Sequence, residues 1–173
     1  MLGFLIAVCL VSIIACRKDK PAEEEIVTPI PTAGIAEVTP AVTVSPAATK
    51  NITYYTLSGN MEKEEMTMLL AEAAELTPEY LVDYVAQSME DVSINVEVDS
   101  VTVSGSAVIV SFKEDTAPVR DTGADVEDAI LDAIAQSILE NFLEYTKVIY
   151  RVMGQGYVSE NKRFGLNHVY LEN

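Results

Sequence analysis

The distribution of proline separates the part of this 173-residue chain that can build regular structure from the part that cannot. Five of the seven prolines fall between Arg17 and Lys50, in a segment rich in Ala, Thr, Val and Glu. Proline removes a backbone donor and fixes φ, so this composition favours extended, solvated conformations over helix or sheet. We therefore expect residues 16–50 to be a disordered linker and residues 51–173 to form a single folded domain.

The first fifteen residues have the character of a secretory leader. Leu2–Ala15 is apolar apart from one Gly and one Ser; it is short for a membrane span and matches the apolar centre of a signal peptide. The segment ends in Ile-Ile-Ala followed by Cys16, which resembles the lipobox of bacterial lipoproteins. The resemblance implies a lipoprotein signal peptide over residues 1–15 and lipidation of Cys16, with acyl chains such as palmitate.

Two alternatives to a cleaved leader stay open. No Lys or Arg precedes the apolar stretch, although signal peptides normally carry one there. A retained transmembrane helix is the first alternative, in which Arg17, Lys18 and Lys20 favour a cytoplasmic location for the rest of the chain. A buried core segment is the second. On the lipoprotein interpretation, two acyl chains at about 0.8 kcal/mol per buried methylene hold the protein on the extracytoplasmic side of the cell membrane.

The expected domain is acidic and free of cysteine. Both cysteines, Cys9 and Cys16, precede it, so residues 51–173 can form no disulfide and offer no thiol. These residues hold 22 Asp and Glu against 7 Lys and Arg, and so carry −15 of the net charge of −16. A surface this negative repels phosphate backbones, which excludes nucleic acid as a partner.

Periodicity in the first half of the domain predicts a strand and a helix. The segment 52–57 is β-branched and aromatic, and the Ser-Gly-Asn that follows is typical of a turn. The segment 65–72 fits both the helical and the strand period. Thr77-Pro78 marks the start of a helix, with Thr as the N-cap, that runs to about Met89. Its predicted core face consists of Leu81, Tyr84, Val85 and Ser88.

The second half predicts a hairpin, a long helix and two strands. In residues 94–112 apolar and polar residues alternate on both sides of a Ser-Gly-Ser turn, which predicts a hairpin. The alternation shifts by one residue at Asp99-Ser100, which indicates a bulge. Thr122–Asp125 matches a capping box, and the apolar spacing after it predicts a helix to about Tyr145. Strands are expected at 147–153 and 169–171. The most economical fold is α+β, a small and mostly antiparallel sheet with two helices packed on one face.

The stretch from Asp99 to Gly154 resembles the GerMN domain of sporulation and germination lipoproteins of endospore-forming bacteria. The likeness is carried by the hairpin text VDSVTVSG and VIVSF, by the helix with Gln-Ser-Ile-Leu at 136–139, and by the strand VIYRVMG. Met153 stands where the family has the Asp of Val-Asp-Gly, and Phe112 with Lys113 stands where Asp-Leu is usual.

This resemblance implies one GerMN-like domain over residues 51–173 and favours a strand for residues 65–72. It implies a non-enzymatic role in the cell envelope, through contacts with other envelope proteins, in sporulation or germination. Some relatives carry tandem copies that assemble into rings. This chain has one copy, so oligomerisation is possible but is not supported by a second copy of the domain. A ligand- or glycan-binding lipoprotein and a cell-wall enzyme are the alternative functions.

Two short motifs suggest chemistry that their context does not support. Ser159-x-x-Lys162 fits the Ser-x-x-Lys of penicillin-binding enzymes, but their Ser-Asp-Asn and Lys-Thr-Gly partners are absent from the sequence. Gly154-Gln-Gly156 lacks the third glycine of a dinucleotide-binding loop and indicates a turn.

The sequence predicts no metal or cofactor. Asp121, Asp125 and Asp128 do not fit the spacing of an EF-hand, because Gly123 occupies a ligand position, and acidic residues at a helix N-terminus interact favourably with the helix dipole. His168 is the single histidine, and zinc with one histidine and no cysteine would be unusual. We expect no catalytic residue in this domain.

Overall fold

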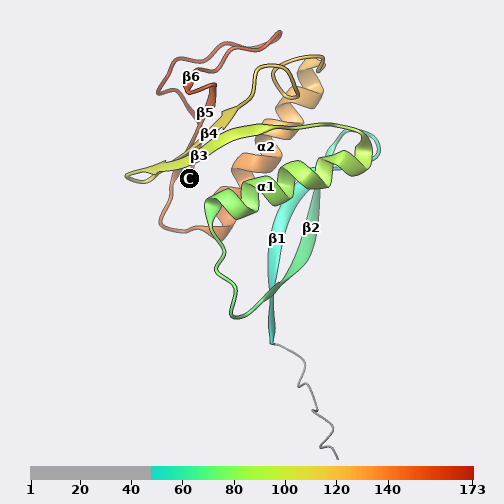
Figure 1. The fold of residues 1–173 in the computed structure, drawn as a ribbon, viewed down its shortest axis with the longest axis vertical. Helices are drawn as coiled ribbons and strands as arrows, with labels where there is room; N and C mark the ends of the chain where they lie inside the picture. The colour runs from blue at the N-terminus through green and yellow to red at the C-terminus, as the bar shows by residue number, and fades with distance from the viewer. Residues whose placement is uncertain (1–47) are drawn as a thin grey trace, which may run out of the picture. The chain divides into compact units, whose positions relative to one another are not determined.

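Two separate sheets and two α-helices make up the structure, a computed structural model that describes residues 48–173 (Figure 1). β1 (Thr49–Leu57) and β2 (Lys63–Ala71) form an antiparallel hairpin. The remaining elements are α1 (Pro78–Ser88), the 3-10 helix η1 (Met89–Val92), β3 (Val98–Ser104), β4 (Ala107–Phe112), α2 (Ala124–Asn141), β5 (Lys147–Val152), β6 (Gln155–Gly156) and β7 (Val169–Glu172). The predicted signal peptide, Cys16 and the linker through residue 47 lie outside the described residues.

The predicted α+β class is confirmed, and the strand pairs are mostly antiparallel. The strands divide between two sheets, however, where the sequence predicted one. The larger sheet has the order β3-β4-β5-β6, with β7 also paired to β5. The outer edge of β1 is occupied by α2: the Tyr55 N–H donates to Ser137 Oγ at 2.8 Å, and Asn141 Nδ2 donates to the Thr53 carbonyl at 2.7 Å. These side-chain bonds take the place of a neighbouring strand.

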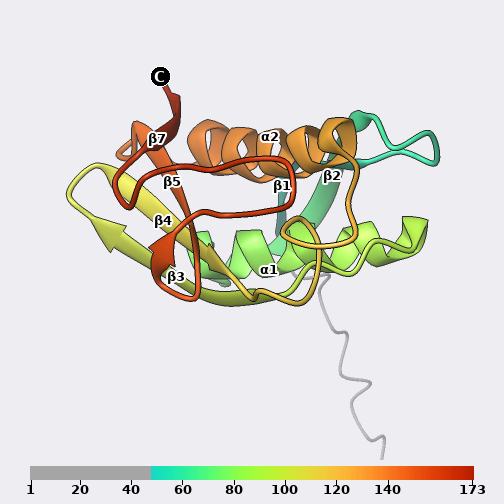
Figure 2. The same ribbon diagram turned by 90° about the horizontal axis from the view of Figure 1, so that it is seen from above.

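β4 and β5 form a parallel pair within the larger sheet. Their register runs from Ala107 opposite Lys147 to Phe112 opposite Val152. Parallel neighbours need a long crossover connection, and α2 provides it, so β4, α2 and β5 form a βαβ unit. In Figure 2 the two helices lie beside each other, and α2 lies close to β5 and β7.

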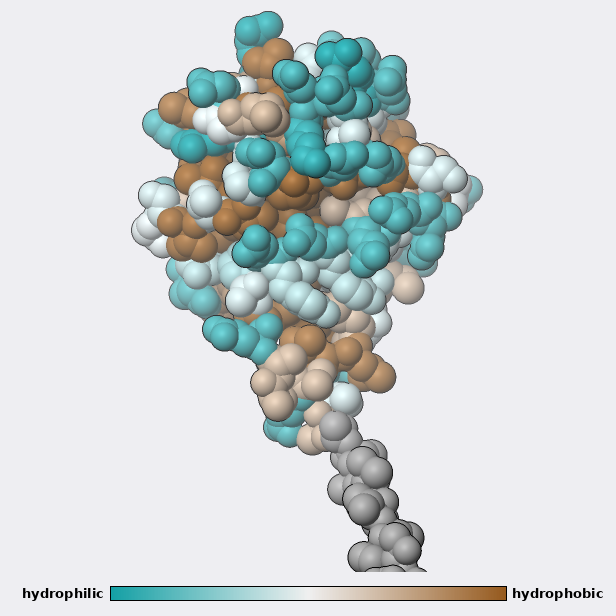
Figure 3. All heavy atoms as spheres, viewed as in Figure 1, coloured by the Kyte–Doolittle hydropathy of each residue, from teal (hydrophilic) through white to brown (hydrophobic). Residues whose placement is uncertain are grey.

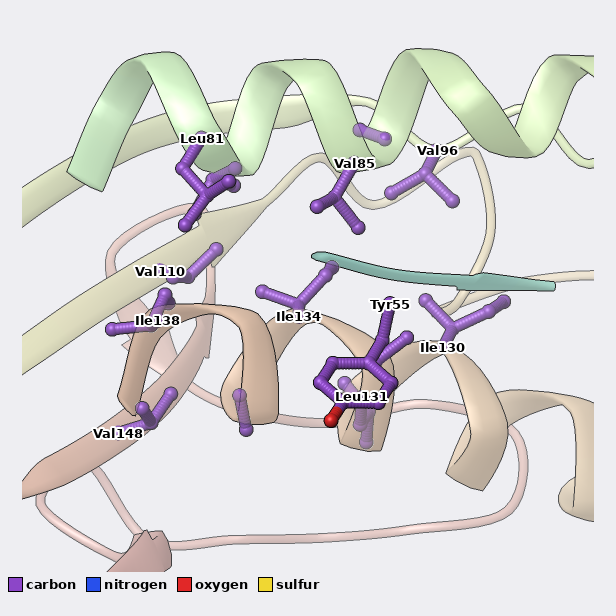
Figure 4. Packing of buried hydrophobic residues seen from close by; sticks show 14 of the residues in the cluster. Tyr55, Leu81, Val85, Val96, Val110, Ile130, Leu131, Ile134, Ile138 and Val148 are labelled. Carbon is purple, nitrogen blue, oxygen red and sulfur yellow. The ribbon is translucent and has the colours of Figure 1, made fainter. Parts of the chain in front are cut away.

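The core lies where the two helices meet both sheets. Leu81 and Val85 of α1 are fully buried, as are the isoleucines of α2 that follow one another at four-residue steps. Figure 4 shows these side chains together with Val110 and Val148 of the larger sheet and Tyr55 of β1. Each helix thus buries one apolar stripe, which is the usual source of helix stability in a small domain.

Several local predictions are confirmed. α1 starts at Pro78, and the Thr77 hydroxyl group accepts a hydrogen bond of 3.2 Å from the Tyr80 N–H. The β3–β4 register shifts between Val98 and Ser100, where the parity slip indicated a bulge. The ambiguous segment 65–72 belongs to a strand, since β2 covers residues 63–71.

The predicted limits of α2 are wrong at both ends. Gly123 is the N-cap and makes no side-chain cap bond, while the Thr122 hydroxyl group donates to the Arg120 carbonyl instead. The helix ends at Asn141 because Phe142 leaves helical geometry at φ −127° and ψ 89°. The Phe142 side chain is buried, so the chain turns there toward β5. Neither helix within residues 48–173 is long and apolar enough to cross a membrane.

Candidate functional site

An open groove of about 530 Å³ runs between α1 and the chain that leads into β3, and we call it the α1 groove. Its lining residues are Tyr80, Asp83, Tyr84, Ala86, Gln87, Glu90, Val96 and Val98. Steps of three and four residues place most of the α1 members on one face of the helix. The opposite face, with Leu81 and Val85, is fully buried in the core.

Two tyrosines line the α1 groove, and a third, Tyr54, supports them from β1. The rings of Tyr80 and Tyr84 are stacked, with centroids 6.4 Å apart and planes at 24°. Tyr54 of β1 meets Tyr84 edge to face, with centroids 5.1 Å apart. Tyr54 is buried, whereas the Tyr80 side chain is 44% exposed. The row of three rings is therefore held by the core at one end and open to a ligand at the other.

A second hollow of about 350 Å³ continues the groove toward β1. It shares Tyr84, Gln87 and Glu90 with the α1 groove and adds Tyr54, Ser88 and Asp91. The sequence predicted Tyr84 and Ser88 on the core face of the helix, but both side chains are only half-buried. Because an aromatic ring is apolar on its faces and polar at its hydroxyl group, Tyr84 fits this boundary between core and solvent.

The surroundings of the α1 groove are negatively charged. Between Lys63 and Lys113 the sequence has no Lys, Arg or His and ten Asp and Glu. Although Asp83 is exposed, partial desolvation by its surroundings and, to a smaller extent, the charge of Glu79 raise the pKa of its carboxyl group. Figure 3 shows this face of the molecule, where hydrophilic side chains follow α1 beside a band of apolar surface over β3 and β4. A cation would find both charge and aromatic faces here.

The serine and the lysine of the Ser-x-x-Lys motif bind different acidic residues. The Ser159 hydroxyl group donates to Glu127 Oε1 at 2.7 Å, and the Lys162 ammonium group lies 2.8 Å from Asp128 Oδ1. In this arrangement the lysine does not activate the serine. The Gly154 turn is confirmed by its φ of +73°, and Gly156 is required because a Cβ there would lie 2.8 Å from the Phe164 carbonyl oxygen.

The candidate metal ligands do not converge. Within residues 48–173 no group of three His, Cys, Asp or Glu side chains has the geometry of a metal site. His168 stacks on Phe164, with ring centroids 4.7 Å apart and planes at 20°. Asp121 adopts a left-handed backbone conformation, with φ of +55°, ahead of α2.

Sequence reasoning missed the buried carboxylate of Glu127. Its side chain is fully buried in the first turn of α2 and accepts hydrogen bonds from Tyr157, Ser159 and Asn161 at 2.7–2.8 Å. Burial and the bond to Glu127 raise the pKa of the Tyr157 hydroxyl group. One signal was available: Glu127 precedes Ile134 by seven residues and so falls on the apolar stripe of the helix.

Comparison with known proteins adds information on the fold. No protein-family model matches the chain, and no curated protein matches it. Among solved structures, the tandem GerMN domains of the sporulation protein GerM from Bacillus subtilis align with 82% of this chain and 49% of theirs, at 14% identity and a TM-score of 0.49. In fold, this chain resembles a GerMN-domain protein. The alignment spans about half the length of the GerM structure.

A second solved structure is similar at lower score. It is a proposed lipoprotein from Clostridium perfringens, aligned over 76% of this chain and 99% of its own, at 16% identity and a TM-score of 0.36. At such identities the likeness concerns the fold alone. The α1 groove is therefore interpreted from its own residues.

Proposed function

We propose that this protein is a lipid-anchored, non-enzymatic interaction module of the cell envelope, whose α1 groove binds a basic segment of a partner protein. The observation that carries the proposal is the pair of stacked rings, Tyr80 and Tyr84, set among carboxylates in a stretch of 49 residues without Lys, Arg or His.

Each part of the groove has a role in this proposal. Tyrosine side chains give large contact area for little loss of side-chain entropy, and an exposed ring attracts the face of an Arg guanidinium group or a Lys ammonium group. Asp83 and Glu90 add negative charge that steers a basic segment to the groove. Val96 and Val98 offer an apolar wall for the methylene stems of long basic side chains.

The same proposal places the domain outside the cytoplasm. A diacylated Cys16 would fix the chain to the membrane, and the linker that precedes β1 would hold the domain away from the bilayer, at an average of roughly 30 Å for a flexible coil. The resemblance to GerMN lipoproteins supports a role in sporulation or germination. The anchor is tested with Cys16→Ala, which should release the protein from the membrane; unchanged partitioning into detergent would contradict it.

Photo-crosslinking in the native cell tests the groove. A photoreactive amino acid at position 80 of the full chain should capture one specific protein, identified by mass spectrometry. The control position is Glu144, which is exposed in the turn after α2. Asp83→Lys should reduce the yield at position 80 at least several-fold, because it reverses the charge that attracts the partner. Equal yields from positions 80 and 144 would contradict the proposal.

Glycan binding is the second candidate. The observation that favours it is the stacked pair of tyrosine rings beside the amide of Gln87, since flat aromatic faces and amide groups also suit a sugar ring. The two candidates differ in salt dependence, because ion pairing with a basic segment is screened and sugar stacking is not. Titration of the protein with soluble cell-wall glycan at low and high salt separates them.

A further inference from the structure

The outer edge of β3 has no partner strand in the described part of the chain. β3 is the last strand in the order β3-β4-β5-β6, and Figure 2 shows it along the margin of the larger sheet. From Ser100 to Ser104 every side chain is exposed except that of Val101, which is half-buried. Val103 is 47% exposed, which is unusual for valine.

We propose that this edge pairs with the same edge of a second copy of the chain, so that two larger sheets join into one. Residues 100–104 read Ser-Val-Thr-Val-Ser, the same in both directions. A two-fold axis through Thr102 would therefore place valine opposite valine and serine opposite serine. A two-fold interface must be self-complementary, and this segment is self-complementary residue by residue.

The backbone of β3 fits the same axis. Ser104 and Ala107 flank the two-residue turn of the β3–β4 hairpin, so they form a pair that exchanges hydrogen bonds across it. Along an antiparallel ladder, such hydrogen-bonded pairs alternate with pairs whose backbone groups point to the other side of the strand. The N–H and C=O groups of Val101 and Val103 consequently point away from β4. With the axis at Thr102, Val101 of one copy lies opposite Val103 of the other, and these free groups bond to one another.

The lack of charge along this edge of a strongly acidic domain allows a second copy to approach it. The tract from Ser100 to Phe112 contains no charged residue, although the domain carries −15. Charged residues normally protect an exposed edge from pairing. The exposed strand β2 has this protection, since it begins Lys63-Glu64-Glu65. In the proposed dimer Asp99 lies opposite Gly105, so the acidic side chains that flank the tract do not face each other.

Disulfide trapping in the full chain tests the register. Thr102 of one copy would face Thr102 of the other as a non-hydrogen-bonded pair, with Cα atoms about 4.5 Å apart, which suits a disulfide. Under mild oxidation in the cell envelope, Thr102→Cys should give a covalent dimer. Ser100→Cys and Ser104→Cys should each give none, and the double variant carrying both should restore it. The unmodified chain controls for Cys9 and Cys16.

A second measurement guards against a crosslink formed by chance collision. The full chain in detergent should have twice the mass of one chain by light scattering, corrected for bound detergent. Thr102→Lys places two ammonium groups together at the axis and should halve that mass, whereas Thr102→Val should leave it unchanged. A monomeric wild type, equal crosslinking at positions 100 and 102, or a covalent adduct with a different protein would each overturn the proposal.

Discussion

The Tyr157 hydroxyl group donates a hydrogen bond of 2.7 Å to the carboxylate of Glu127, and both side chains are fully buried. Ser159 and Asn161 donate to the same carboxylate. Through these bonds Glu127 of α2 holds the segment between β6 and β7 in place. Most residues of that segment belong to no strand.

Tyr157→Phe is therefore expected to lower the free energy of unfolding by about 1–3 kcal/mol, because it leaves a buried carboxylate with one donor fewer. Equilibrium denaturation in urea measures the change. Tyr80→Phe is the matched control; its side chain is exposed, and we expect a change within about 0.5 kcal/mol. Equal effects of the two substitutions would show that the buried bond does not stabilise the fold.

Ser137→Ala should destabilise the junction between β1 and α2. The serine accepts from the Tyr55 N–H at 2.8 Å and donates to the Ala133 carbonyl, and it is fully buried. Alanine leaves the Tyr55 N–H buried without an acceptor, at a cost of about 1–3 kcal/mol. Amide hydrogen exchange should accelerate at Tyr55 relative to Leu81 in the core of α1. Unchanged protection of the Tyr55 amide would refute the role assigned to Ser137.

Thr77→Ala should lower stability by about 1 kcal/mol, because the first turn of α1 loses its side-chain cap. Thr77→Ser keeps the capping oxygen and should behave like the wild type. Thermal unfolding of both variants checks this expectation. A loss of similar size in the serine variant would mean that the threonine methyl group, and not the cap, is responsible.

The raised pKa of Asp83 predicts a pH-dependent effect of Asp83→Asn. Because partial desolvation and the nearby charge of Glu79 raise the pKa of Asp83 in the folded state, the folded protein binds more protons than the unfolded chain between the unfolded pKa, about 3.9, and the folded value. The stabilising contribution of Asp83 is thus present below that window and lost as the pH rises through it. Asparagine mimics the protonated form, so the variant should melt at a higher temperature than wild type at pH 7 and at the same temperature at pH 3. Glu160→Gln, at a carboxylate outside the α1 groove, is the control.

Features encoded by neighbouring residues were predictable from sequence. The Thr77-Pro78 start of α1 depends on the preference of two adjacent residues, and the bulge near Asp99 depends on a local change of parity. The start of α2 was misjudged because Thr122 satisfies the capping pattern while its hydroxyl group bonds within the preceding turn. A rule based on residue spacing does not show whether a Thr hydroxyl group caps the helix or bonds to a nearby backbone carbonyl instead.

The tertiary relationships were not predictable from these rules. Ser137 and Asn141 contact β1 across 82 and 88 residues of sequence, so no periodicity signals that they end the small sheet. The α1 groove was predictable only in part: the helix that carries Tyr80 and Asp83 was predicted correctly. The position of Tyr84 at its rim depends on Tyr54, which comes from a distant strand.

The parallel pairing of β4 with β5 has a consequence for the order of folding. The partners are forty residues apart, whereas the two hairpins join strands separated by a few residues. Closing a long loop costs entropy before its contacts form, so we expect the hairpins to form early and the β4–β5 ladder to form near the rate-limiting step. Conservative substitutions at Val148 should then slow folding, and those at Thr67 should mainly accelerate unfolding, as stopped-flow kinetics can establish.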